Sequence, residues 1–168
     1  MPRFKEWEAP EIKEGEDTKY GWRVSYVDNF HMGLCTDIGY GTYIMAKYWV
    51  IIGHDVQIGG GVKIYSESTI DDTHGSVIIN KGAKIGAMSV IMPGVTIGEG
   101  AIIGACSLVK EDVPAGETWF GVPAKPRGGR YVERQENYSR WGLWPFGSGD
   151  FSSFPTCWRR NPNIGFKP

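Results

Sequence analysis

The sequence predicts an all-β fold, a parallel β-helix coiled from short strands, on three observations. Aliphatic residues recur every six positions, a glycine often follows the aliphatic, and the residue four positions after it is small or β-branched. Because strand side chains alternate faces, the aliphatic and the small residue point to the same side. The phased aliphatic runs are Met32, Ile38 and Ile44; Ile52, Ile58, Ile64 and Ile70; and Ile79, Ile85, Ile91, Ile97, Ile103 and Val109.

A unit of six residues is too short for an α-helix or a hairpin, but it suits one flat strand and one corner. Stacked coils place like side chains over one another, and several coils are needed before the apolar faces are covered. Three units per coil would make a triangular prism of about four turns between Met32 and Val109. The glycine column fits corners that need a positive φ or close backbone approach. A β-sandwich would instead show a period of two with irregular loop spacing.

The charge balance, the apolar runs and the cysteines of the sequence limit the partners and the location that we expect. The 18 Lys and Arg residues nearly balance the 19 Asp and Glu residues, so we expect no nucleic-acid partner. No apolar run suggests a signal peptide or a membrane span, and the three cysteines are far apart. We therefore expect free thiols and a cytoplasmic location.

The prism predicted over residues 31–126 is flanked by two segments without the repeat. Residues 1–30 are charged and aromatic, and we expect them to cap the open end of the coil. In residues 127–168 we expect a short helix and then an irregular aromatic tail. This tail either packs on a neighbouring subunit or forms a wall of a binding pocket.

The segment IGAMSVIMPGVTIGEGAIIGACSLVKEDVPAGETWFGVPAKP, residues 85–126, closely resembles the hexapeptide-repeat acyltransferases. More narrowly it is similar to the maltose/galactoside and sugar O- or N-acetyltransferase branch, which includes lipopolysaccharide-modifying members. The resemblance implies a left-handed β-helix, a homotrimer with shared sites, and acetyl-CoA as cosubstrate without a metal.

The repeat changes phase between Ile70 and Ile79, which are nine residues apart, and the polar segment DDTHGS (71–76) lies there. Polar loops on a regular scaffold often carry function. The resemblance places a catalytic histidine just ahead of the next coil, and His74 holds that position. Histidine suits a general base because its ordinary pKa is near neutral pH. Asp71 and Asp72 are the candidates to orient its ring.

The resemblance also implies positions for coenzyme A. Ala87 and Ala105 match the small residues beside its extended arm. Lys110 with Glu111 follows the last full coil, and Lys125 and Arg127 lie at the exit of the repeat. Cations there would suit the nucleotide phosphates.

These features predict acetyl transfer to a hydroxyl or amine of a sugar or nucleotide-sugar, such as a polysaccharide or lipopolysaccharide precursor. Acetylation of an antibiotic is an alternative within this class. A metalloenzyme like the γ-class carbonic anhydrases is a second alternative, opposed by the absence of a His-x-x-x-x-His pair among His31, His54 and His74. A β-helix that only scaffolds a complex is a third.

Overall fold

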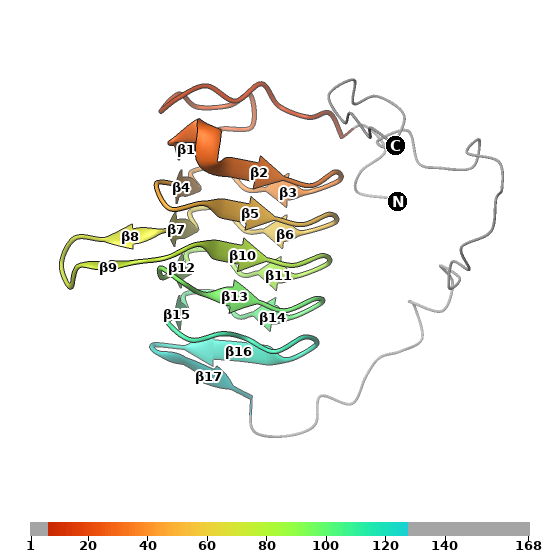
Figure 1. The fold of residues 1–168 in the computed structure, drawn as a ribbon. Helices are drawn as coiled ribbons and strands as arrows, with labels where there is room; N and C mark the ends of the chain where they lie inside the picture. Colours follow the sequence, from red (N-terminus) through yellow and green to blue (C-terminus); the bar gives the residue numbers. More distant parts are fainter. Residues whose placement is uncertain (1–6, 128–168) are drawn as a thin grey trace, which may run out of the picture.

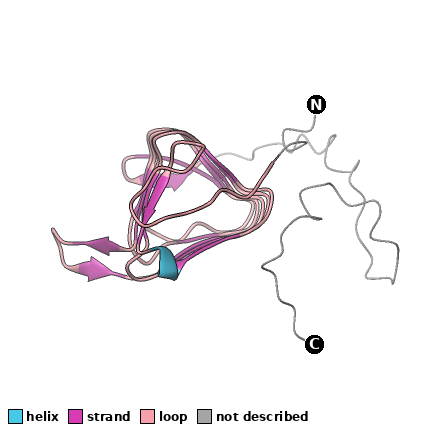
Figure 2. Cartoon of the chain, turned by 90° about the horizontal axis from the view of Figure 1, so that it is seen from above, coloured by secondary structure: helices cyan, strands magenta, loops and turns pink. Residues whose placement is uncertain are grey.

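Parallel strands stack in three sheets that form the faces of a triangular coil (Figures 1 and 2). The computed structural model describes residues 7–127, so the helix and tail predicted beyond Arg127 lie outside the described residues. Apart from one 3-10 turn, η1 (Val27–Asn29), the described residues hold no helix. The prediction of an all-β parallel coil is confirmed, and the architecture is consistent with the left-handed β-helix that the resemblance implies.

Each of the first four coils contributes one strand to each face of the prism, and the last coil contributes strands to the first and third faces. The first sheet contains β1 (Arg23–Ser25), β4 (Tyr43–Met45), β7 (Lys63–Tyr65), β12 (Val90–Ile91) and β15 (Leu108–Val109). The second contains β2 (Phe30–Met32), β5 (Val50–Ile52), β10 (Val77–Ile79) and β13 (Thr96–Ile97). The third contains β3 (Asp37–Ile38), β6 (Gln57–Ile58), β11 (Lys84–Ile85), β14 (Ile102–Ile103), β16 (Thr118–Gly121) and β17 (Ala124–Pro126), with β17 antiparallel to β16.

The predicted aliphatic column forms the interior of the prism. Ile44, Ile64, Ile91 and Ile97 are fully buried, and small residues four positions later, such as Thr42 and Ala83, are buried with them. Full burial of an isoleucine stabilises a fold by about 2–3 kcal/mol, so this column contributes a large share of the apolar stabilisation. Ile70 is the exception, because its side chain is 97% exposed.

Residues 7–22 cross the N-terminal end of the prism, where Ile12 packs on the core and Trp22 is buried (Figure 1). The strand β1 pairs with β4, so the coil already begins at Arg23, before the predicted boundary at residue 31. Cys106 is a free, exposed thiol as expected. Cys35 is disulfide-bonded, so the expectation of three free thiols is wrong at this position.

The glycine column is required by close approach of successive coils. A Cβ on Gly86 would lie 2.3 Å from the backbone nitrogen of Ala105, and one on Gly98 would lie 2.3 Å from that of Ala115. Positive φ angles instead occur two residues further on, for example at Gly82 (φ 69) and Met88 (φ 60). Close backbone approach and positive φ, the two explanations that the sequence left open for glycine, thus apply at different positions of the repeat.

This separation predicts different costs for two alanine substitutions. Gly86→Ala forces two backbones apart and should lower the free energy of unfolding by about 3 kcal/mol, the upper range for overpacking. A Cβ on Gly82 meets no atom within 4 Å, so Gly82→Ala has only the left-handed conformation to accommodate. This substitution should lower the free energy of unfolding by about 1 kcal/mol. Urea unfolding at equal protein concentration compares the two. Equal stability of the two variants would contradict this assignment.

Candidate active site

A two-stranded antiparallel hairpin interrupts the coil at one corner of the prism. Its strands are β8 (Glu67–Ser68) and β9 (Thr73–His74), and it projects away from the triangular body (Figures 1 and 2). His74 lies on β9 opposite Glu67 and is exposed. The predicted histidine therefore stands on an ordered arm outside the regular coil.

The insertion is longer than the sequence analysis predicted. Ile79 pairs with Ile52, 27 residues earlier, whereas Ile97 pairs with Ile79, 18 residues earlier. The extra residues begin after Ser66, whose backbone N–H still bonds to Met45 of the preceding coil. Ile70, predicted as a core position, lies in the turn between β8 and β9, so that prediction is wrong.

A second, smaller irregularity lies at the same corner one coil earlier. Ile44 and Ile52 are eight residues apart, so the connection from β4 to β5 is two residues longer than the repeat requires. The connection from β7 to β10 carries the hairpin and joins the same two faces. Lys47, Tyr48 and Trp49 therefore lie beside the base of the hairpin.

Two contacts join this corner to the hairpin. The rings of Tyr48 and His74 are stacked, with centroids 4.7 Å apart and an interplanar angle of 30°. Lys47 Nζ donates to Glu67 Oε1 at 2.6 Å, and this hydrogen bond is the main cause that raises the pKa of Lys47 above its ordinary value. Lys47, Tyr48 and Glu67 were not predicted from the sequence, although the eight-residue spacing from Ile44 to Ile52 was a signal for the first two.

The two predicted carboxylates lie in the turn of the hairpin. Asp71 Oδ1 accepts a hydrogen bond from Thr73 Oγ1 at 2.9 Å. Hydrogen bonds from the Ser68 and Thr73 hydroxyls lower the pKa of the Asp71 carboxyl. Asp72 has a left-handed backbone, with φ 56. Within residues 7–127, neither carboxylate forms a hydrogen bond or an ion pair with His74.

The other two histidines have separate surroundings. His54 Nδ1 accepts the backbone N–H of Leu34 at 2.9 Å, which ties two coils together. His31 stacks on Trp49 with ring centroids 5.5 Å apart. In the part of the chain that the structure describes, no three His, Cys, Asp or Glu side chains are grouped as metal ligands would be.

The residues predicted to bind coenzyme A fall into two groups. Ala87 and Ala105 are exposed on successive coils of one corner, where Cys106 donates its backbone N–H to the carbonyl of Ala87. Lys125 Nζ donates to Glu111 Oε1 at 2.7 Å, close in sequence to the exposed Lys110. The backbone N–H of Arg127 donates to the carbonyl of Thr118. Ala87 and Ala105 lie where the chain passes from the third sheet to the first, Lys110 follows β15 of the first sheet, and Lys125 lies on β17 of the third sheet.

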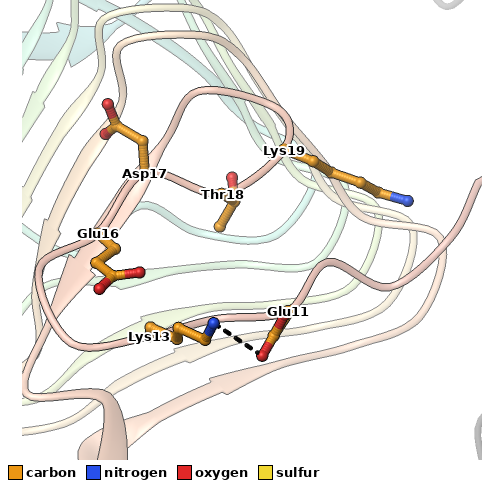
Figure 3. A pocket seen from close by; sticks show the side chains of 6 residues that line it. All are labelled: Glu11, Lys13, Glu16, Asp17, Thr18 and Lys19. Carbon is orange, nitrogen blue, oxygen red and sulfur yellow. Dashed lines mark ion pairs between the residues drawn. The ribbon is translucent and has the colours of Figure 1, made fainter.

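A hollow of about 220 Å³ lies in the segment that crosses the N-terminal end of the prism (Figure 3). An ion pair of 3.2 Å between Lys13 and Glu11 lies on its edge. None of the predicted site residues contributes to it. Its lining is Glu11, Lys13, Glu16, Asp17, Thr18 and Lys19.

A sequence model of the bacterial transferase hexapeptide family (six repeats) matches residues 76–111. This segment of the chain carries the hexapeptide repeat of that family. The matched segment runs from the end of the hairpin to the loop after β15, so it contains Ala87, Ala105, Lys110 and Glu111 but begins two residues after His74.

Solved structures share this hexapeptide-repeat coil. A hexapeptide-repeat acetyltransferase of Vibrio cholerae O1 biovar eltor, complexed with acetyl coenzyme A, is 26% identical with a TM-score of 0.60, over 62% of each chain. A maltose O-acetyltransferase of Clostridium difficile 630 is 27% identical with a TM-score of 0.58, over 63% of this chain and 62% of that one. A galactoside acetyltransferase in complex with coenzyme A is 27% identical with a TM-score of 0.56, over 63% and 57%.

The hexapeptide-repeat chain thus spans about three fifths of the length of these structures. No curated protein matches it in sequence. Within residues 7–127, no helix is long and apolar enough to cross a membrane.

Proposed function

We propose that this protein is an acetyl-CoA-dependent acetyltransferase whose acceptor is a hydroxyl or amine of a sugar or nucleotide-sugar. The observation that carries the proposal is the hairpin, which holds His74 on an ordered arm beside an aromatic and charged corner. The three solved structures reported above are acetyltransferases, and two of them contain acetyl coenzyme A or coenzyme A. The names of two specify a maltose and a galactoside enzyme, which supports a sugar acceptor.

In the proposed reaction His74 is the general base. Its imidazole takes the proton from the acceptor hydroxyl or amine while that oxygen or nitrogen attacks the acetyl carbonyl carbon. The tetrahedral intermediate collapses, the carbon–sulfur bond breaks, and the imidazolium returns the proton to the thiolate of coenzyme A. Exposure of His74 on the hairpin leaves its ring open to an acceptor. Asp71 and Asp72 add negative charge beside the base, and Asp71 also orders the turn through Thr73.

For coenzyme A we propose the two groups of residues that the resemblance implies. The short side chains of Ala87 and Ala105 leave room for an extended arm along the corner. Lys110, Lys125 and Arg127 supply positive charge for phosphates. The resemblance implies a site shared between neighbouring chains of a homotrimer. That assembly and a cytoplasmic location stay predictions.

The proposal is tested by following thiol release from acetyl-CoA with a panel of sugars, amino sugars, sugar nucleotides and hydroxyl- or amine-bearing antibiotics. We expect acceptor-dependent release, and mass spectrometry of the acetylated product distinguishes O- from N-transfer. Stoichiometric zinc in the purified protein together with CO2 hydration, and no thiol release with any acceptor, would contradict the proposal and favour the metalloenzyme.

The coenzyme A corner has its own prediction. Ala105→Leu should raise the KM for acetyl-CoA about tenfold or more, because the added side chain fills the space of the arm and tenfold corresponds to about 1.4 kcal/mol. Ala115→Leu is the matched control. Ala115 is also exposed, and its backbone packs on Gly98 as the backbone of Ala105 packs on Gly86. The initial rate at varied acetyl-CoA compares them. An equal KM in both variants would argue against this corner.

A further inference from the structure

An exposed histidine on a strand of two residues needs something to fix its ring, and the structure offers an aromatic ring for this. The imidazole of His74 stacks on the Tyr48 ring at 4.7 Å and 30°. We propose that Tyr48 is a positioning residue that holds the imidazole of His74 in one orientation by ring stacking. This inference rests on the proposed function, in which His74 is the base.

Tyr48 is itself held by the residue from which the hairpin departs. Its backbone N–H donates to Ser66 Oγ at 2.9 Å, and Ser66 Oγ donates to the carbonyl of Met45 at 2.8 Å. The carbonyl of Ser66 accepts the backbone N–H of Gly75, next to His74, at 3.0 Å. Ser66 is fully buried, so these bonds are shielded from water. One buried serine therefore fixes the backbone of Tyr48 and the backbone beside His74 relative to each other.

A second tie joins the same corner to the other strand of the hairpin. Glu67 is the cross-strand partner of His74, and its carboxylate accepts from Lys47 Nζ at 2.6 Å. Lys47 Nζ also lies 5.6 Å from the centroid of the Tyr48 ring, within the range of a cation–π contact. The corner thus contacts β8 through Lys47 and β9 through Tyr48, which limits how far the hairpin can tilt.

Within the described residues, Asp71 and Asp72, the carboxylates nearest to His74 in sequence, form no hydrogen bond or ion pair with its ring. Asp71 accepts from the Thr73 hydroxyl within the turn, which occupies one of its oxygens. The ring of Tyr48 contacts the face of the imidazole and leaves both ring nitrogens available. That arrangement suits a base that first takes a proton and later returns it.

The test uses Tyr48→Leu, which removes the ring, and Tyr48→Phe, which keeps it. Aromatic pairs favour their stacked geometry by about 2- to 12-fold. Tyr48→Leu should therefore lower kcat by about that factor with an unchanged KM for acetyl-CoA, measured with the best acceptor of the panel. Tyr48→Phe should keep the wild-type kcat.

A readout independent of activity comes from proton NMR of the imidazoles. The chain has three histidines, so each Cε1–H resonance can be assigned by substituting one histidine at a time. Tyr48→Leu should move the His74 resonance, because the ring current is lost, and leave that of His54 in place. Trp49→Leu is the matched control and should move the resonance of His31, which stacks on Trp49, but not that of His74.

The outcomes separate this inference from the proposed function. An unmoved His74 resonance in a folded Tyr48→Leu protein, judged by circular dichroism, would overturn the stack. A moved resonance with unchanged kcat would overturn the positioning role. Equal losses of kcat in Tyr48→Phe and Tyr48→Leu would assign the effect to the hydroxyl and also overturn it. If His74→Ala kept the full rate, the base would be wrong whatever Tyr48 does.

Discussion

His74→Ala should lower kcat for acceptor-dependent thiol release by about 10²- to 10⁴-fold, the usual contribution of a general base. The KM for acetyl-CoA should change little, because Ala87 and Ala105 lie at another corner of the prism, between the third and first sheets. His74 is exposed on the hairpin, so its loss leaves the core intact and the unfolding midpoint unchanged.

The matched control for this substitution is His31→Ala. His31 is also exposed and also stacks on an aromatic ring, that of Trp49. It lies on β2, outside the hairpin, and should keep the wild-type kcat. Comparable losses in both variants would show that the effect does not depend on the position of His74.

The largest expected effect on stability comes from the interior column. Ile52→Ala should lower the free energy of unfolding by about 2–5 kcal/mol, because Ile52 is 2% exposed and stacks between Met32 and Ile79 in adjacent strands. The rigid coil above and below cannot collapse into the cavity. Chemical denaturation at fixed protein concentration measures this change.

The neighbouring residue on the same strand provides the control. Ile51 points outward and is 39% exposed, so Ile51→Ala removes the same atoms and should cost less than about 1 kcal/mol. If Ile51→Ala destabilised the isolated chain as much as Ile52→Ala, the inward and outward faces of β5 would be wrongly assigned.

The repeat could be predicted from sequence because each coil obeys the same local rule. Each interior side chain stacks on the side chain at the same position of the next coil. Ile79 therefore stacks on Ile97, and the other pairs are Ile85 with Ile103 and Ile91 with Val109. A sequence period records that constraint directly. The tail and the assembly do not follow such a rule, so no period describes them.

The hairpin could be located from the phase change, but its length could not. Ile70 falls six residues after Ile64 by coincidence and so imitates a further core position. Its side chain is exposed, and nothing in the spacing distinguishes it from a buried isoleucine. The predicted insertion was therefore too short.

The neighbours of His74 were harder to predict because their contacts join different coils. Tyr48 is 26 residues from His74 in sequence, and only the stacking of two irregular corners brings their rings together. Sequence proximity suggested Asp71 and Asp72 instead. The eight residues from Ile44 to Ile52 were the one sequence signal of this second irregular corner.

The central claim, that the imidazole of His74 performs the proton transfer, is tested most directly by chemical rescue. Acceptor-dependent thiol release by His74→Ala is measured as imidazole is added to the assay. We predict a rate far below that of the wild type without imidazole, and a rise with imidazole concentration as the free base enters the vacated space. A variant that releases thiol at the full wild-type rate without imidazole would contradict the claim.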